Sequence, residues 1–167
     1  MKQFYIDFLG AQTELETDMI CFLRYDDEHH RVAIVGLPNL RSRDRSTAGL
    51  EHIAFTYNTV EDLFKSYHQR KALGMKPIWC VNHGPTLSIY WADPDGNQIE
   101  TQVDVFDSPE EASTLMRTSD FAQNPFGVDF VVEEFEKRMA AGEPLKDLLK
   151  RPSIGPRGPE TIPLLNF

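Results

Sequence analysis

Two side chains that can bind a metal ion lie at the ends of strand-like runs far apart in the sequence. His52 opens the run at residues 50–57, and Glu100 follows a turn at residues 93–97. A histidine and a carboxylate are two members of the facial triad of two histidines and one carboxylate. That triad holds Fe(II) and leaves positions open for substrate and dioxygen. The sequence therefore predicts a metal site with two visible ligands, His52 and Glu100.

Each of these residues also has a plainer interpretation. His52 alone fits a strand histidine that bonds a neighbour. Glu100 shares its strand face with Gln98 and Gln102, so the three side chains could simply face solvent. The combination of His52 with Glu100 is what favours a metal site.

Two adjacent histidines, His29 and His30, precede the strand-like run at residues 32–34. Neighbouring residues on a strand point to opposite faces, so at most one of them can face a cleft. Imidazole titrates near neutral pH, and the functional interpretation makes His30 a catalytic proton donor and acceptor. The alternative is a surface turn.

Tyr90 and His83 are the remaining candidates, both for contact with a substrate. Tyr90 has the same face parity as Glu100, so its phenol could point into the same pocket; the alternative is core packing. His83 lies in the loop before that strand, where it either lines the substrate entrance or is an ordinary turn residue.

The elements that must position these residues follow from hydrophobic periodicity and from turn residues. Helices are predicted at residues 1–9, 60–73, 109–117 and 132–141, and strands at residues 19–25, 31–36, 50–57, 77–81, 86–92 and 98–103. The second block is a β-α-β-β-β unit. The first block resembles the same unit without its opening strand.

This order predicts an α+β fold in which paired β-α-β-β-β units form a curved mixed sheet around a metal cleft. The first unit is expected to be truncated at its N-terminus. Residues 1–107 form the paired-unit domain, and residues 108–167 are expected to be a helix-rich C-terminal extension packed on the same domain. With 167 residues, of which 41% are hydrophobic, the chain can bury one core.

Composition limits the class of partner. The formal net charge of −9 argues against nucleic acid or an anionic membrane as a partner, because both attract clusters of Lys and Arg. The two cysteines, Cys21 and Cys80, lie in apolar runs without a close partner, which argues against a disulfide scaffold. No apolar stretch reaches about 18 residues. We expect a cytoplasmic protein with a small-molecule substrate, and an exposed sheet edge favours a homodimer or higher homo-oligomer.

Three segments together resemble the type I extradiol ring-cleavage dioxygenases of the vicinal oxygen chelate superfamily. They are residues 28–34, residues 50–53 and residues 82–100, and the resemblance covers residues 1–105. The nearest likeness is to biphenyl-2,3-diol 1,2-dioxygenases and catechol 2,3-dioxygenases. The Asp-Pro-Asp-Gly-Asn turn at residues 93–97 also occurs in glyoxalases and antibiotic-resistance proteins of the superfamily, so it indicates only the fold. The paired histidines and the Tyr90-to-Glu100 interval are more specific.

The resemblance implies a role for each matching residue. His52 and Glu100 match the second and third metal ligands, His30 matches the acid/base histidine, and Tyr90 matches a tyrosine that hydrogen-bonds the substrate. The implied cofactor is Fe(II), with Mn(II) as an alternative because both accept this ligand set. Dioxygen is the implied co-substrate, and a catechol-like aromatic diol is the implied substrate.

The chain departs from the family at the first metal ligand, a histidine on the opening strand of the first unit. The sequence begins at the following helix, and His29, His68 and His83 do not lie at the matching position. We expect a shortened form of a longer protein. The alternatives are a partner subunit that restores the strand and its ligand, or a protein that has lost iron chemistry. A non-catalytic small-molecule-binding protein of the same fold is therefore the second interpretation of function, and a glyoxalase-like isomerase or lyase is the third.

Overall fold

Eight strands in two sheets, six α-helices and one short 3-10 helix form the part of the chain described by the computed structural model, residues 1–44 and 47–163. The helices are α1 (Lys2–Leu9), α2 (Val60–Ala72), α3 (Pro109–Met116), α4 (Ser119–Gln123), α5 (Val132–Ala140), α6 (Leu145–Leu149) and η1 (Pro159–Thr161). The strands are β1 (Gln12–Glu16), β2 (Ile20–Arg24), β3 (Val32–Val35), β4 (His52–Tyr57), β5 (Trp79–Asn82), β6 (Thr86–Ala92), β7 (Gln98–Asp104) and β8 (Val128–Asp129). The predicted α+β class is confirmed.

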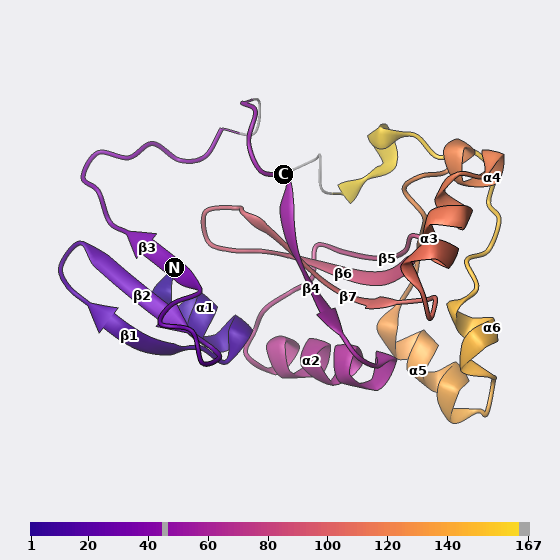
Figure 1. Ribbon diagram of the computed structural model, residues 1–167, viewed down its shortest axis with the longest axis horizontal. Coiled ribbons are helices and arrows are strands. Elements are labelled where there is room, and N and C mark those ends of the chain that lie inside the picture. The colour runs from indigo at the N-terminus through magenta and orange to yellow at the C-terminus, as the bar shows by residue number, and fades with distance from the viewer. Residues whose placement is uncertain (45–46, 164–167) are drawn as a thin grey trace.

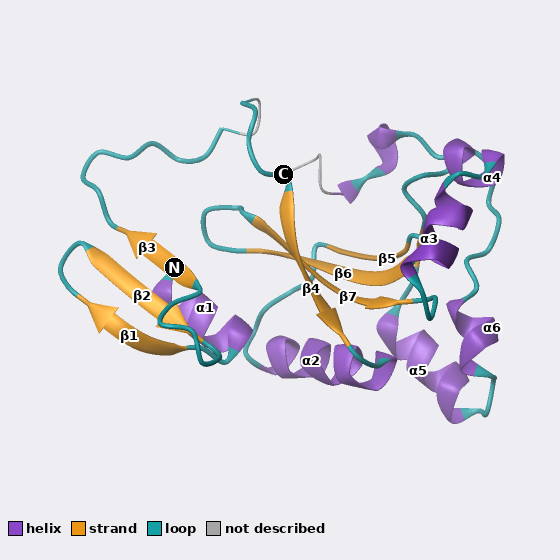
Figure 2. Ribbon diagram, viewed as in Figure 1, coloured by secondary structure: helices purple, strands orange, loops and turns teal. Residues whose placement is uncertain are grey.

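The first unit consists of α1 and an antiparallel sheet in the order β1-β2-β3 (Figure 2). The α1 helix ends at Gly10, whose φ of 65° lies in the left-handed region that glycine adopts without strain. Its apolar side chains pack on the buried Cys21 and Leu23 of β2. A helix followed by three strands is the arrangement expected for the first unit.

The second unit is the predicted β-α-β-β-β unit, extended by one short strand. Its sheet has the order β4-β7-β6-β5-β8, with β4 parallel to β7 and the other pairs antiparallel. The α2 helix runs below this sheet, and β4 forms one edge of it (Figure 1). The parallel β4–β7 pair is possible because α2 and two further strands lie between them in sequence.

One face of the second sheet packs on α2 and forms the main core. Thr59 caps α2 by accepting a hydrogen bond from the backbone N–H of Asp62 at 3.1 Å. The largest buried members of this core on the sheet are Leu87, Ile89 and Trp91 of β6. On α2 they are Val60, Leu63, Phe64 and Tyr67. Alternation along each strand turns the other set of side chains, among them Ser88, Tyr90 and Glu100, to the opposite face of the sheet.

The C-terminal helices complete this same core. Phe135 of α5 and Leu148 of α6 are buried in it, and β8 pairs with β5 at the sheet edge. The division of the chain at residue 107 stays a prediction. None of the helices in the described ranges is long and apolar enough to cross a membrane.

A buried arginine joins the two units. The Arg70 side chain donates a hydrogen bond to the Phe8 carbonyl at 2.7 Å and another to the Tyr57 hydroxyl at 3.1 Å. Its guanidinium also lies 4.0 Å from the centroid of the Phe8 ring, a distance at which a cation and an aromatic face attract. These contacts fix the end of α1 against α2 and β4.

The strands β1 and β8 and the α-helices α4 and α6 were not predicted from the sequence, because they are short or lack hydrophobic periodicity. Every residue of β1 is exposed, so this strand has no apolar alternation to reveal it. The α4 and α6 helices have five residues each, and β8 has two. Segments this short are set by tertiary contacts rather than by their own periodicity.

Gly127 offers a test of how closely the C-terminal segment packs on the sheet. Its φ is +89°, and an added Cβ would lie 2.3 Å from the Asn82 carbonyl oxygen. Gly142 has a similar φ of +85° with nothing within 4 Å of an added Cβ. We expect Gly142→Ala to lower the free energy of unfolding by about 1–2 kcal/mol, from backbone strain alone. Gly127→Ala is expected to lower it by about 1–3 kcal/mol more.

Urea denaturation of the two variants measures this difference. Equal losses would show that the loop at Gly127 does not press on β5.

Candidate functional site

The register of β4, β7 and β6 gathers the candidate residues on one face of the second sheet. Ala54 of β4 pairs with Glu100 of β7, and His52 lies two residues before Ala54 on the same face. Tyr90 of β6 lies directly opposite Glu100 on the other side. The predicted common parity of Tyr90 and Glu100 is confirmed.

His52 and Glu100 form a close pair. The His52 Nε2 atom lies 3.0 Å from Glu100 Oε2. The Glu100 side chain is 5% exposed, whereas the His52 side chain is 33% exposed and can be reached from solvent. The other ring nitrogen of His52 contacts the Glu51 carboxylate. Carboxylates at both nitrogens fix the orientation of the ring, and a carboxylate at the second nitrogen, as at His52 Nδ1, is also the usual partner of a metal-ligating histidine.

The pair is charged when no metal is bound. The hydrogen bond to Glu100 raises the pKa of His52 to about 9, despite partial burial that acts in the opposite direction. Burial by itself would raise the pKa of Glu100, but hydrogen bonds from His52 and Ser88 outweigh burial and hold it below its ordinary value. At neutral pH the site therefore contains an imidazolium next to a buried carboxylate.

Tyr90 and His83 form a second pair beside the first. The Tyr90 hydroxyl lies 3.0 Å from His83 Nε2, and the Tyr90 ring meets the His52 ring edge-on with centroids 5.3 Å apart. Burial raises the pKa of Tyr90, and the charge of Glu100 raises it further, so the phenol stays protonated. Burial lowers the pKa of His83. Both side chains are neutral at neutral pH and can exchange hydrogen bonds with a substrate oxygen.

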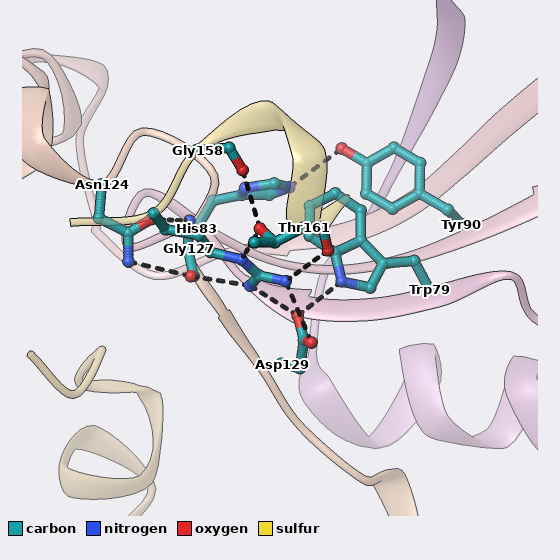
Figure 3. Close-up of polar contacts among 9 residues, drawn as sticks. Trp79, His83, Tyr90, Asn124, Gly127, Asp129, Gly158 and Thr161 are labelled. Atoms are coloured by element: carbon teal, nitrogen blue, oxygen red, sulfur yellow. Dashed lines mark hydrogen bonds and ion pairs between the residues drawn. The ribbon is translucent and has the colours of Figure 1, made fainter. Parts of the chain in front are cut away.

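Trp79 extends the site and was not recognised in the sequence. Its ring stacks on Tyr90 with centroids 5.4 Å apart, and its Nε1 donates to Asp129 Oδ1 at 2.7 Å (Figure 3). In the register of β5 and β6, Trp79 lies opposite Tyr90. Strand pairing could have revealed Trp79, because cross-strand partners share a face. Asp129 belongs to β8, a strand without a sequence signal.

His30 is not brought to this cluster. Its ring stacks on Phe22 of β2 at a centroid distance of 4.8 Å and lies edge-on to His29 at 4.3 Å. Within residues 1–44 and 47–163, these are its ring contacts, and its buried Nδ1 has no hydrogen-bond partner. The proton-transfer role of His30 stays a prediction, since the structure supplies no contact between His30 and the other candidates.

The residues on the polar face fit part of a metal site. Two donor atoms at right angles, each about 2.1 Å from one divalent ion, lie about 3 Å apart, and His52 Nε2 and Glu100 Oε2 have this separation. Gln98, on the same face, has a buried amide oxygen without a hydrogen-bond partner. In the described part of the chain, no group of three or more His, Cys, Asp or Glu residues is arranged to hold a metal. The site therefore offers two donors of the predicted triad.

Comparisons with known proteins identify the family of the chain. The profile of the Glyoxalase/Bleomycin resistance protein/Dioxygenase superfamily matches residues 1–101. Biphenyl-2,3-diol 1,2-dioxygenase 2 of Rhodococcus globerulus is 38% identical over 146 residues, which cover 87% of this chain and 77% of that protein. Biphenyl-2,3-diol 1,2-dioxygenase 3 of the same organism is 41% identical over 153 residues, which cover 90% of this chain and 80% of that protein.

A solved structure supports the fold alone. The genomically encoded fosfomycin resistance protein FosX of Listeria monocytogenes aligns with a TM-score of 0.51 at 20% identity, covering 68% of this chain and 85% of that one. The sequence resemblance is thus confirmed by the superfamily profile and by two relatives named as dioxygenases. The chain belongs to the Glyoxalase/Bleomycin resistance protein/Dioxygenase superfamily and is a dioxygenase-like oxidoreductase within it.

Proposed function

We propose that this protein is an extradiol ring-cleavage dioxygenase that acts on a catechol-like aromatic diol with Fe(II) and dioxygen. The observation that carries the proposal is the buried Glu100 carboxylate held 3.0 Å from the His52 imidazole, next to a protonated tyrosine. The names of the two Rhodococcus relatives favour biphenyl-2,3-diol as the first substrate to test. Mn(II) is the alternative metal, because it accepts the same donors.

In this proposal His52 and Glu100 would hold the ion, and His52 would have to give up the proton that it shares with Glu100. Binding therefore releases the His52 proton, as metal ligation by imidazole requires. When bound, the ion supplies the one-electron chemistry that amino-acid side chains lack. The low exposure of Glu100 limits the access of water to this end of the site.

Tyr90 and His83 act on the substrate. The Tyr90 hydroxyl is held by His83 Nε2 at 3.0 Å, so its position is fixed before a substrate binds. The phenol can donate a hydrogen bond to a substrate oxygen, while the neutral His83 ring can accept a hydrogen bond from the phenol or take a proton from the substrate. His30 remains the proposed second proton carrier.

The metal ligands can be tested by removing each one. We expect His52→Ala and Glu100→Ala to weaken Fe(II) binding by more than about 100-fold, since loss of a direct ligand exceeds the effect of losing its supporting contacts. His68 and Glu136 form a matched control pair on the surface, with Nε2 and Oε2 2.9 Å apart. His68→Ala should leave iron binding unchanged.

The measurement is iron content per chain after anaerobic loading and desalting. Full iron content in both the His52 and the Glu100 variants would refute the ligand assignment. An unaltered chain that binds biphenyl-2,3-diol but loses its iron would instead indicate a non-catalytic binding protein.

Tyr90→Phe tests the substrate contact without removing a metal donor. It deletes one hydroxyl from a buried ring and leaves His83 without that partner. We expect iron content to be retained and kcat/KM for the diol to fall by about 10- to 100-fold, the value of one hydrogen bond to a charged group. Unchanged kcat/KM would assign Tyr90 to packing alone.

His30→Ala tests the role predicted from the paired histidines. If His30 carries a proton, the variant retains iron and kcat falls. The matched control is His29→Ala, because His29 is the exposed neighbour. Equal effects of the two changes would remove His30 from the mechanism.

A further inference from the structure

The C-terminal segment returns to the sheet face that carries Tyr90 and is fastened there by Arg157. The Arg157 guanidinium meets both carboxylate oxygens of Asp129, at 2.7 and 3.1 Å, and donates to the Gly127 carbonyl at 3.0 Å. It also donates to the hydroxyl of Thr161 at 2.9 Å and to its carbonyl at 3.3 Å. The Arg157 side chain is 9% exposed, and its guanidinium lies 5.4 Å from the centroid of the Trp79 ring.

We call these contacts of Arg157 with Asp129, Gly127 and Thr161 the clasp. A two-pronged pairing of arginine with a carboxylate fixes the orientation as well as the distance. Asp129 also accepts from Trp79 Nε1, so one carboxylate connects β5, β8 and the C-terminal segment. Thr161 is held by Arg157 and by its own bond to the Gly158 carbonyl at 2.8 Å. The residue that follows Thr161 is therefore fixed in place.

That residue is Ile162, and it packs in the apolar cluster that contains Tyr90. Ile162 is 6% exposed, and its cluster partners are Trp79, Val81 and Tyr90. The partly buried Ile78 and Phe126 complete the cluster. In Figure 3 the C-terminal ribbon passes beside the rings of Tyr90 and Trp79.

This cluster adjoins Tyr90, the residue proposed to contact the substrate. The side chains around Glu100 on this face, among them Gln98, Ser88 and His52, are polar. An aromatic ring bound next to the Tyr90 hydroxyl needs an apolar wall, because small-molecule sites surround most of their ligand with apolar side chains. On this face, the cluster of Trp79 and Ile162 supplies such a wall adjoining Tyr90.

We infer that Ile162, held by the clasp of Arg157 and Asp129, is a specificity-determining residue that limits the size of the ring substituent on the diol. The inference rests on the proposed function for the class of substrate.

Two diols that differ in one substituent test the inference. The probes are catechol and biphenyl-2,3-diol, and the measurement is the ratio of their Kd values, taken anaerobically by calorimetry with and without Fe(II). We expect Ile162→Ala to shift this ratio at least about tenfold toward the larger diol, within the range that small changes in an apolar pocket produce. Ile162→Val should shift it less.

The control is Ile154→Ala, which removes the same side chain from the same segment at a position that is 55% exposed. It should leave the ratio unchanged. Arg157→Lys keeps the charge but cannot form the two-pronged contact. It should shift the ratio in the same direction as Ile162→Ala, because it loosens Thr161 and hence Ile162.

The outcomes separate this inference from the proposed function. Folded Ile162→Ala protein, verified by its thermal unfolding, that binds both diols with an unchanged ratio would overturn the inference and leave the dioxygenase proposal intact. A shifted ratio in a chain that holds no iron would support the inference and end the catalytic proposal. An unaltered chain that binds neither diol would overturn both.

Discussion

The parallel pairing of β4 with β7 is the constraint on which the site depends. It places Ala54 opposite Glu100 and so brings His52, two residues earlier on the same face, within 3.0 Å of the carboxylate. A slip of one residue would turn Glu100 toward the helix-covered face, because side chains alternate along a strand. That face is filled by Leu87, Ile89 and Trp91, so burial of the core holds the register that aligns the candidate ligands.

Burial of the Glu100 carboxylate on the polar face costs folding free energy, which burial of the apolar core must offset. A carboxylate with little exposure is unfavourable unless it is paired. Glu100 is compensated by His52 and Ser88 in the metal-free protein, and the Tyr90 ring closes one side. The buried charge of Glu100 is thus neutralised by the His52 imidazolium, and a cation bound at this carboxylate would have to displace the His52 proton.

Local pattern was sufficient to predict the second unit. The Thr59 cap, the periodicity of α2 and the turn at residues 93–97 predicted α2, β6 and β7, and the two-residue period placed Tyr90 with Glu100. Residues whose role depends on long-range contacts were not predicted. Asp129 and Arg157 belong to a two-residue strand and an irregular segment, and they matter only because the chain folds back onto Trp79. The motif of His29 and His30 was recognised in the sequence, but its position was not. A local motif does not say where the first sheet lies relative to the second.

The direct test of the account is the position of iron in the folded protein. Crystals of the unaltered chain, loaded anaerobically with Fe(II), would give an anomalous difference map at the iron absorption edge. One peak is expected, within bonding distance of His52 Nε2 and a Glu100 carboxylate oxygen. A peak elsewhere, for example at the surface pair of His68 and Glu136, or no peak at the His52–Glu100 pair, would contradict it.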